Sequence, residues 1–222
     1  MSSRKSAKNS LSKLDSTDIS RFKVVDLFAG VGGLSYGFAK NSKFEIVAAN
    51  EILAPMAAAY RLNHPNVRMY EGDIKDFGRS SIRRDLGILV GEVDLVVGGP
   101  PCQAYSTVGK RLLDDPRGQL FQEYFRVLGE LKPKAFIFEN VKGLISMSGG
   151  DLLPTIIEKF ESLGYTVEWK LLNAADYGVP QTRERVIIVG SRGGVFSFPK
   201  QTHGDPEDPS FRKTNLSPWL TL

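Results

Sequence analysis

Short β-rich apolar runs alternate with longer amphipathic stretches from Lys23 onward, a rhythm typical of βαβ units around a mainly parallel sheet. Two later runs, Thr166–Leu172 and Arg185–Val189, have no helix between them, so we expect them to pair antiparallel at one edge. The other expected strands are Lys23–Phe28, Glu45–Ala49, Val67–Glu71, Val93–Gly98 and Lys134–Glu139. Helices are expected at about Gly33–Lys40, Pro55–Asn63, Arg79–Leu86, Gln119–Leu131 and Leu152–Leu163. The sequence thus predicts an α/β fold with a mainly parallel sheet and an antiparallel edge hairpin.

Composition divides the 222 residues into three parts. Residues 1–20 are basic and rich in serine, which predicts a disordered tail. Residues 21–192 carry the alternating pattern and predict a single domain with one core. Residues 193–222 mix proline with glycine and charged residues, which is typical of an extended linker.

Charge and cysteine usage limit the class of protein. No run of eighteen apolar residues is present, so we expect no membrane span and a cytoplasmic or nucleoid-associated protein. One cysteine, Cys102, cannot form an internal disulfide, which fits a reducing compartment. The net charge of +4 is compatible with binding to nucleic acid but is weak support for it, because much of the excess lies in the first thirteen residues.

The unusual residues of this sequence follow the expected strands. A glycine-rich turn follows the first strand, Glu51 the second, Asp73 the third and Cys102 the fourth, and Glu139 closes the fifth. Ligands of open α/β sheets bind beyond the carboxyl ends of the strands. These residues are therefore expected to form one site.

The glycine-rich turn between Asp26 and Gly33 would let a ligand approach the backbone closely. It is not the dinucleotide fingerprint, because Ser35 stands where the third glycine would be. Glu51, about twenty residues on, could accept hydrogen bonds from both hydroxyls of a ribose, and Asp73 from an adenine amino group. Together these residues predict an adenosine site, in which Ile52 and Ile74 could sandwich the ring.

Cys102 follows two glycines and two prolines that stiffen the exit from a strand, a setting that offers the sulfur to something outside. A Cys–His hydrolase would need a histidine base, and neither His64 nor His203 is well placed for that role. Glu139 ends an otherwise apolar strand, where desolvation favours the protonated acid and so a proton donor. In Gln181–Val186, one guanidinium could hydrogen-bond a base oxygen and the other could hold Glu139.

In order and spacing, these stretches resemble motifs I, IV, VI and VIII of the cytosine-C5 DNA methyltransferases, from about Lys23 to Gly190. The resemblance implies a Rossmann-like, S-adenosylmethionine-dependent methyltransferase fold, with residues 21–192 as the catalytic domain. It also implies transfer of a methyl group from S-adenosyl-L-methionine to C5 of a flipped cytosine in double-stranded DNA. The transfer would proceed through a covalent Cys102 adduct and leave S-adenosyl-L-homocysteine.

The resemblance also assigns roles to single residues, and no metal site is expected. Cys102 would be the nucleophile, Glu139 would address N3 and the amino group of cytosine, Arg185 would contact its O2, and Arg183 would support them. The implied cofactor-binding residues are Phe28, Ala29, Gly30, Gly32, Gly33, Leu34, Asn50, Glu51, Ile52, Asp73, Ile74 and Pro100. The implied DNA-binding residues are Gln103, Ser106, Lys110 and Arg111, on a loop resembling the one that closes over DNA.

The sequence departs from the family after motif VIII, because complete members continue into a target-recognition region and motifs IX and X. We therefore expect either a truncated chain or one subunit of a split restriction–modification methyltransferase, in which a second polypeptide supplies those parts. Two other readings remain open: an RNA cytosine-C5 methyltransferase, and a catalytically silent subunit of a methyltransferase complex. A nicotinamide oxidoreductase would share the first βαβ unit, but its reaction would give Cys102 no chemical role.

Overall fold

The computed structural model describes residues 21–101 and 119–220. Its main sheet has the strand order β3-β2-β1-β4-β5-β7-β6. The strands are β1 (Phe22–Leu27), β2 (Phe44–Glu51), β3 (Arg68–Glu71), β4 (Leu95–Gly98), β5 (Ala135–Val141), β6 (Thr166–Asn173) and β7 (Glu184–Ser191). The helices are α1 (Gly33–Ala39), α2 (Ala54–Asn63), α3 (Arg79–Leu86), α4 (Gln119–Leu131) and α5 (Leu152–Ser162). The expected α/β fold is confirmed, with each expected element present and its ends shifted by a few residues at most.

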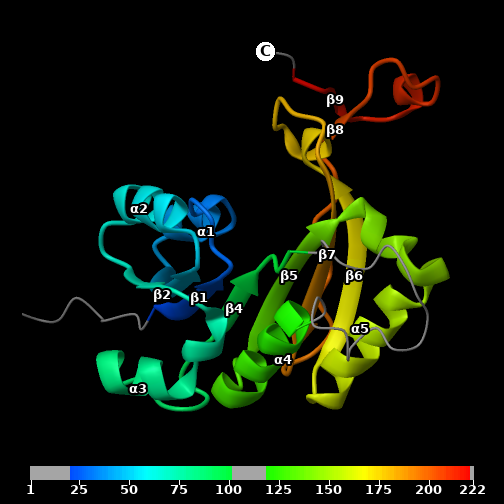
Figure 1. Ribbon diagram of the computed structural model, residues 1–222. Helices are drawn as coiled ribbons and strands as arrows, with labels where there is room; N and C mark the ends of the chain where they lie inside the picture. Colours follow the sequence, from blue (N-terminus) through cyan, green and yellow to red (C-terminus); the bar gives the residue numbers. More distant parts are fainter. Residues whose placement is uncertain (1–20, 102–118, 221–222) are drawn as a thin grey trace, which may run out of the picture.

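The direction of each strand follows from what connects it to the next. Helices link β1 to β2 and β2 to β3, and these strands pair parallel, as do β1 with β4 and β4 with β5. No α-helix separates β6 from β7, and β7 inserts antiparallel between β5 and β6. The expected antiparallel hairpin is confirmed, with β6 as the edge strand (Figure 1).

Alternating side chains of β1 pack into two layers, because successive residues of a strand point to opposite faces. Val25 and Leu27 join the larger core, which also contains residues of α3, α4 and α5. Val24 lies on the other face, against Leu34 and Phe38 of α1. Asp26 shares that face with Val24, so a buried carboxyl group lies close to Ser35 of α1 and Tyr60 of α2.

The strand order changes direction between β1 and β4. From β1 the chain builds outward to β2 and β3, then returns to place β4 on the other side of β1. The helices that follow β1 and β4 pack on opposite faces of the sheet, and open α/β folds have a crevice at such a position. The fold thus creates a candidate ligand site where the glycine-rich turn and the Gly-Gly-Pro-Pro stretch begin.

The segment after β7 contains short elements where the sequence predicts an extended linker. Two two-residue strands, β8 (His203–Gly204) and β9 (Ser217–Pro218), pair parallel. Trp219 Nε1 donates to Asp176 Oδ1 at 2.9 Å, which ties the segment to the 3-10 helix η5 (Ala174–Tyr177) beyond β6. The prolines keep much of the segment extended, but this side-chain anchor gives it a defined place above the sheet (Figure 1).

Within the described ranges, no helix is long and apolar enough to cross a membrane.

Gly190 of β7 provides a test of the packing between the hairpin and the core. A Cβ at this position would lie 1.9 Å from the Phe136 ring, which is itself packed against Phe160 with ring centroids 4.2 Å apart. We expect Gly190→Ala to lower the unfolding free energy by about 3 kcal/mol, since the buried ring has no space into which to move. Gly37→Ala is the matched control, because an added Cβ would meet nothing within 4 Å. The control should raise stability by roughly 0.5–1 kcal/mol in urea unfolding, and equal effects of the two changes would contradict this account of the core.

Candidate active site

The glycine-rich turn after β1 is built from residues in the left-handed backbone region. Phe28, Gly30 and Gly32 have φ angles of 54°, 56° and 91°. A Cβ on Gly32 would lie 2.3 Å from Nε2 of His64, whose ring is buried against the turn and stacks on Tyr60. A non-glycine residue such as Phe28 is strained in this conformation, which the surrounding structure must stabilise. Gly32 is therefore required both for its backbone conformation and for the close approach of a histidine ring.

Glu51 holds the turn against the end of β2. Its Oε2 accepts a hydrogen bond from the backbone N–H of Gly30, and its Oε1 accepts one from Leu53, each at 2.8 Å. A carboxylate oxygen can accept two hydrogen bonds, so each oxygen keeps one acceptor position. Glu51 thus has the acceptor capacity that a ribose diol needs, although only 7% of the residue is exposed.

One cavity of about 490 Å³ joins this turn to the ends of β4 and β5. The residues that line it are Asp26, Phe28, Ala29, Gly33, Leu34, Gly99, Glu139 and Arg183. The cavity lies at the change of strand order between β1 and β4, where the fold leaves a crevice. The structure therefore brings predicted cofactor-binding residues and the predicted acid Glu139 into one space.

Glu139 is held by the two arginines of the Gln-x-Arg-x-Arg stretch, Arg183 and Arg185. Its Oε1 lies 2.8 Å from Nε of Arg185 and 3.8 Å from a guanidinium nitrogen of Arg183. A quarter of the Glu139 side chain is exposed, so ion pairing rather than an apolar environment dominates its surroundings. Arg185, expected to contact the base, is the closer partner of Glu139, and Arg183 is the weaker one.

The other carboxylate oxygen of Glu139 faces the exit of β4. A Cβ at Gly99 would lie 2.8 Å from Glu139 Oε2, so a side chain there would take the space beside this oxygen. The next residue on β5, Asn140, is buried and donates from Nδ2 to the carbonyl oxygen of Pro100 at 3.0 Å. This hydrogen bond holds the Gly-Gly-Pro-Pro segment, where the chain leaves β4, next to Glu139.

Asp26 is the most unusual group that lines the cavity. It is 1% exposed, and the polar groups beside it are the Ser35 and Tyr60 hydroxyls, neither of which makes a hydrogen bond of good geometry with its carboxylate oxygens. Burial raises its pKa from 3.8 to about 7; the nearby Ser35 and Tyr60 hydroxyls oppose this shift, and the Glu51 charge adds to it. The same burial raises the pKa of Tyr60 well above its ordinary value. An unpartnered buried carboxyl group is uncommon and calls for a functional or structural explanation.

The other predicted cofactor residues lie around the same turn but differ in what they contact. Asn50 is buried and donates to the carbonyls of Tyr70 and Gly72, which joins the ends of β2 and β3. Asp73 accepts from the Lys75 N–H and caps the 3-10 helix η1 (Ile74–Asp76). Ile52 is 61% exposed and Ile74 only 3%, so the two sides of the expected ring sandwich are unequal.

Several predicted residues fall outside the described ranges. These are Cys102, the expected nucleophile, and the expected DNA-binding residues Gln103, Ser106, Lys110 and Arg111. Asp26, Gly99 and Asn140 were not among the predicted site residues, although all three lie in or beside the motifs. Asp26 carried a usable signal, since it is the one charged residue in the otherwise apolar run that follows Lys23.

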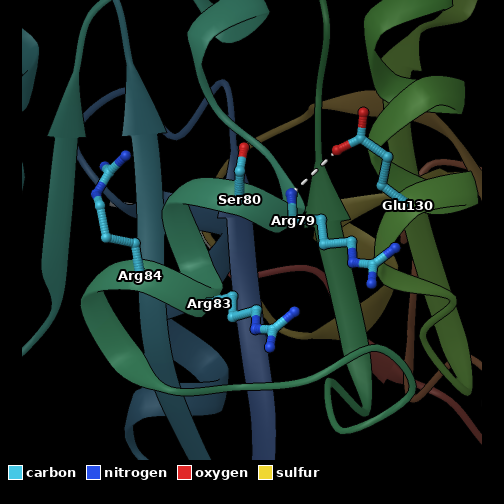
Figure 2. Close-up of a pocket in the computed structure, with 5 residues that line it drawn as sticks. All are labelled: Arg79, Ser80, Arg83, Arg84 and Glu130. Carbon is cyan, nitrogen blue, oxygen red and sulfur yellow. Dashed lines mark hydrogen bonds between the residues drawn. The ribbon is translucent and has the colours of Figure 1, made fainter.

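A second hollow of about 720 Å³ lies between α3 and the end of α4, on the sheet face opposite Asp26 (Figure 2). It is lined by Arg79, Ser80, Arg83, Arg84 and Glu130. Its single carboxylate, Glu130, already accepts from the Arg79 N–H and from Arg126. The hollow therefore offers positive charge but no free acid or base, and the cavity at the strand ends is the better candidate for catalysis.

Replacing Asp26 with asparagine tests the cost of burying this carboxyl group. Between about pH 4 and pH 7 the folded chain retains a proton on Asp26 that the unfolded chain has lost, so wild-type stability falls as the pH rises. Asparagine does not titrate, so the Asp26→Asn variant lacks this fall in stability with pH. In urea unfolding, the stability of Asp26→Asn relative to wild type should rise by roughly 2–3 kcal/mol between pH 5 and pH 8. Asp151→Asn, at an exposed residue, should show no such change, and a pH-independent difference for Asp26→Asn would refute the assignment.

Comparison with known proteins identifies the family. The model of the C-5 cytosine-specific DNA methylases matches residues 22–217. Type II methyltransferase M.AgeI of Thalassovita gelatinovora is 45% identical over 179 residues, which are 81% of this chain and 42% of that protein. Type II methyltransferase M.AquIA of Picosynechococcus sp. is 43% identical over 192 residues, which are 82% of this chain and 77% of that protein.

Solved structures share the same architecture. A prophage-encoded E. coli protein described as a DNA modification methyltransferase superposes with a TM-score of 0.65 at 29% identity, covering 77% of this chain and 46% of that one. The Dnmt2 methyltransferase of S. pombe has a TM-score of 0.61 at 21% identity, covering 81% of this chain and 52% of that one, and supports the fold alone. The chain spans 42% and 41% of two of the curated relatives it matches, M.AgeI and M.XorII. With a family match over nearly all of its described length, this chain belongs to the C-5 cytosine-specific DNA methylase family.

Proposed function

We propose that the chain is the catalytic portion of a DNA (cytosine-5)-methyltransferase, with residues 21–192 as the catalytic domain. The observation that carries the proposal is the single cavity in which Glu139, held by Arg185, meets the glycine-rich turn held by Glu51. The family of the chain makes duplex DNA the favoured substrate, and a DNA substrate would place the protein in the cytoplasm at the nucleoid. RNA cytosine is the runner-up substrate.

The cavity suits S-adenosyl-L-methionine, which supplies an electrophilic methyl group when bound and leaves as S-adenosyl-L-homocysteine. Glu51 keeps acceptor positions for the two ribose hydroxyls. Phe28, Ala29, Gly33 and Leu34 line the cavity with apolar atoms and exposed backbone. Asp73, at the end of β3, would receive the adenine amino group, with Ile52 on its exposed side. The remaining cofactor residues of the turn and strand ends are Gly30, Gly32, Asn50, Ile74 and Pro100.

The chemistry assigned to the chain begins with its one cysteine. C5 of cytosine lacks the electron density to attack a methyl sulfonium, so the Cys102 thiolate would first add to C6. Glu139 would supply a proton at N3 as the ring electrons shift toward that nitrogen, which leaves an enamine whose C5 is the nucleophile for the methyl group. Loss of the C5 proton and expulsion of the thiolate then restore the aromatic base. Because C6 is inaccessible in a stacked duplex, the cytosine must be flipped out, at a cost of a few kcal/mol.

The positions of the two carboxylate oxygens suit Glu139 to this role. Oε1 is occupied by Arg185 and Arg183, which fixes the plane of the group. Oε2 lies over Gly99, where no side chain competes for the space, and is the oxygen available to N3 of the base. Arg185 then acts first by positioning Glu139, and a contact to O2 of the base would use its remaining N–H groups.

We further propose that a second polypeptide supplies target recognition and motifs IX and X. The chain matches less than half the length of M.AgeI and M.XorII, whereas the shared region is 77% of M.AquIA. Residues 193–220, anchored through Trp219 to Asp176, would lead from the catalytic domain toward that recognition part. The loop residues Gln103, Ser106, Lys110 and Arg111 would contact the DNA beside the flipped base.

Trapping on duplex DNA that contains 5-fluorocytosine tests the reaction class. With S-adenosyl-L-methionine and the partner chain present, the wild type should form a covalent adduct that survives denaturation, because fluorine at C5 cannot leave as a proton does. Cys102→Ser should form none, and the chain alone should transfer negligible methyl groups. An adduct in the serine variant, or with tRNA in place of DNA, would overturn the proposed mechanism or substrate. Cofactor binding without any adduct on either nucleic acid would favour a catalytically silent subunit.

Two arginine variants test how Glu139 is positioned. Arg185→Gln removes the 2.8 Å partner of Glu139 and should lower kcat on the order of 10²-fold in the complete enzyme, because the acid loses its fixed orientation. Arg183→Gln removes a partner at 3.8 Å and, at a half-exposed guanidinium, should cost less than about tenfold. Single-turnover methylation at saturating cofactor measures both. Equal losses, or a larger loss for Arg183→Gln, would contradict the ranking.

A further inference from the structure

Two buried carboxyl groups flank the glycine-rich turn, and only one of them has hydrogen-bond partners. Glu51 accepts from two backbone N–H groups, whereas both oxygens of Asp26 lack a partner within the described ranges. Asp26 is nevertheless a lining residue of the cavity assigned to the cofactor. A buried acid that borders a ligand cavity, with two hydroxyls beside it but no cation, is suited to a charged partner that arrives with the ligand.

The groups that face Asp26 provide no compensating charge. From α1 and α2 it is approached by the hydroxyls of Ser35 and Tyr60, which hydrogen-bond to each other at 3.2 Å. From β2 it is approached by the like charge of Glu51, and the buried phenol of Tyr124 on α4 interacts with it electrostatically from the other face of the sheet. His64 also lies behind the turn, with Nε2 at 3.2 Å from the Gly32 carbonyl oxygen. Across the cavity, Arg183 is directed to Glu139. In this part of the chain, a neutral acid is therefore the favoured form while no cation is near.

We propose that cofactor binding releases one proton from Asp26, whose carboxylate then faces a positive charge of the bound cofactor. The inference rests on the proposed function, since S-adenosyl-L-methionine is the ligand that supplies that charge. Its sulfonium and ammonium groups are both cationic, and either would favour the ionised carboxylate in a low-dielectric cavity. Asp26 thus couples cofactor affinity to pH and favours the charged cofactor over less charged analogues.

The direction of the pH dependence follows from the raised pKa of Asp26. Below about pH 7 the empty site holds a protonated Asp26, so binding must remove the proton and becomes weaker. Above that pH the carboxylate is already ionised, and affinity no longer changes. The affinity for S-adenosyl-L-methionine should be roughly tenfold lower at pH 6 than at pH 8, and the protons released should fall from nearly one at pH 6 to about 0.1 at pH 8.

Titration calorimetry in buffers of different ionisation enthalpy measures the released protons directly. S-adenosyl-L-methionine, S-adenosyl-L-homocysteine and 5′-methylthioadenosine form the ligand series, because the second lacks the sulfonium and the third lacks both cationic groups. Release with the first ligand alone identifies the sulfonium as the sensed charge, and release with the first two identifies the ammonium. Binding of S-adenosyl-L-methionine without proton release at pH 6.5 would overturn the inference and leave the proposed function intact. Failure of that ligand to bind to the chain in complex with its partner polypeptide would sink the proposed function as well.

The source of the proton is tested with Asp26→Asn and the matched surface variant Asp151→Asn. Asp26→Asn should abolish proton release and weaken binding of S-adenosyl-L-methionine more than binding of 5′-methylthioadenosine. Asp151→Asn should behave as the wild type. Unchanged release in a folded Asp26→Asn protein would assign the proton to another group, such as the ligand's own ammonium, and refute the inference. If the asparagine variant does not fold, the wild-type ligand series decides the question by itself.

Discussion

The site depends first on the Glu51 carboxylate, which joins two chain segments that the sheet alone would leave apart. One oxygen binds the Gly30 N–H at the end of β1, and the other binds the Leu53 N–H at the start of α2. Because these bonds are charge-assisted, they are stronger than neutral ones and can hold a turn that contains the strained Phe28. The glycine-rich turn beside the proposed cofactor cavity is thereby held by contacts within the chain itself.

The second part of the site, the pair of Glu139 and Arg185, depends on the register of two strands rather than on a turn. In the antiparallel pairing of β5 with β7, Glu139 lies opposite Ile187 and Val141 opposite Arg185. Glu139 and Arg185 are therefore diagonal neighbours on one face of the sheet, within reach of a long side chain. Since side chains alternate between faces, a one-residue slip would separate the pair completely. The antiparallel strand thus gives the acid a partner that comes from a distant part of the chain.

The periodicity of the sequence was enough to predict the sheet, the helices and the edge hairpin, because burial on one or both faces fixes those patterns. The motif residues Glu139, Arg183 and Arg185 could also be placed together from their strand ends. The unpartnered state of Asp26 could not be predicted, because it depends on which side chains from α1 and α2 fail to reach it. The same holds for the unequal burial of Ile52 and Ile74, which core packing rather than motif position decides.

The place of β7 in the sheet has a consequence for the order of folding. β7 lies between β5 and β6 but follows both in the chain, so β5 cannot be completed on that side until residues near the end of the domain have been synthesised. Non-local pairing of this kind is slow, because the chain loses loop-closure entropy before it gains the stabilising contacts between the strands. During translation, the helix-linked strands β1 to β5 can assemble while β6 still lacks its neighbour. Glu139 therefore meets Arg185 late, and the catalytic cavity is among the last features of the fold to acquire its final form.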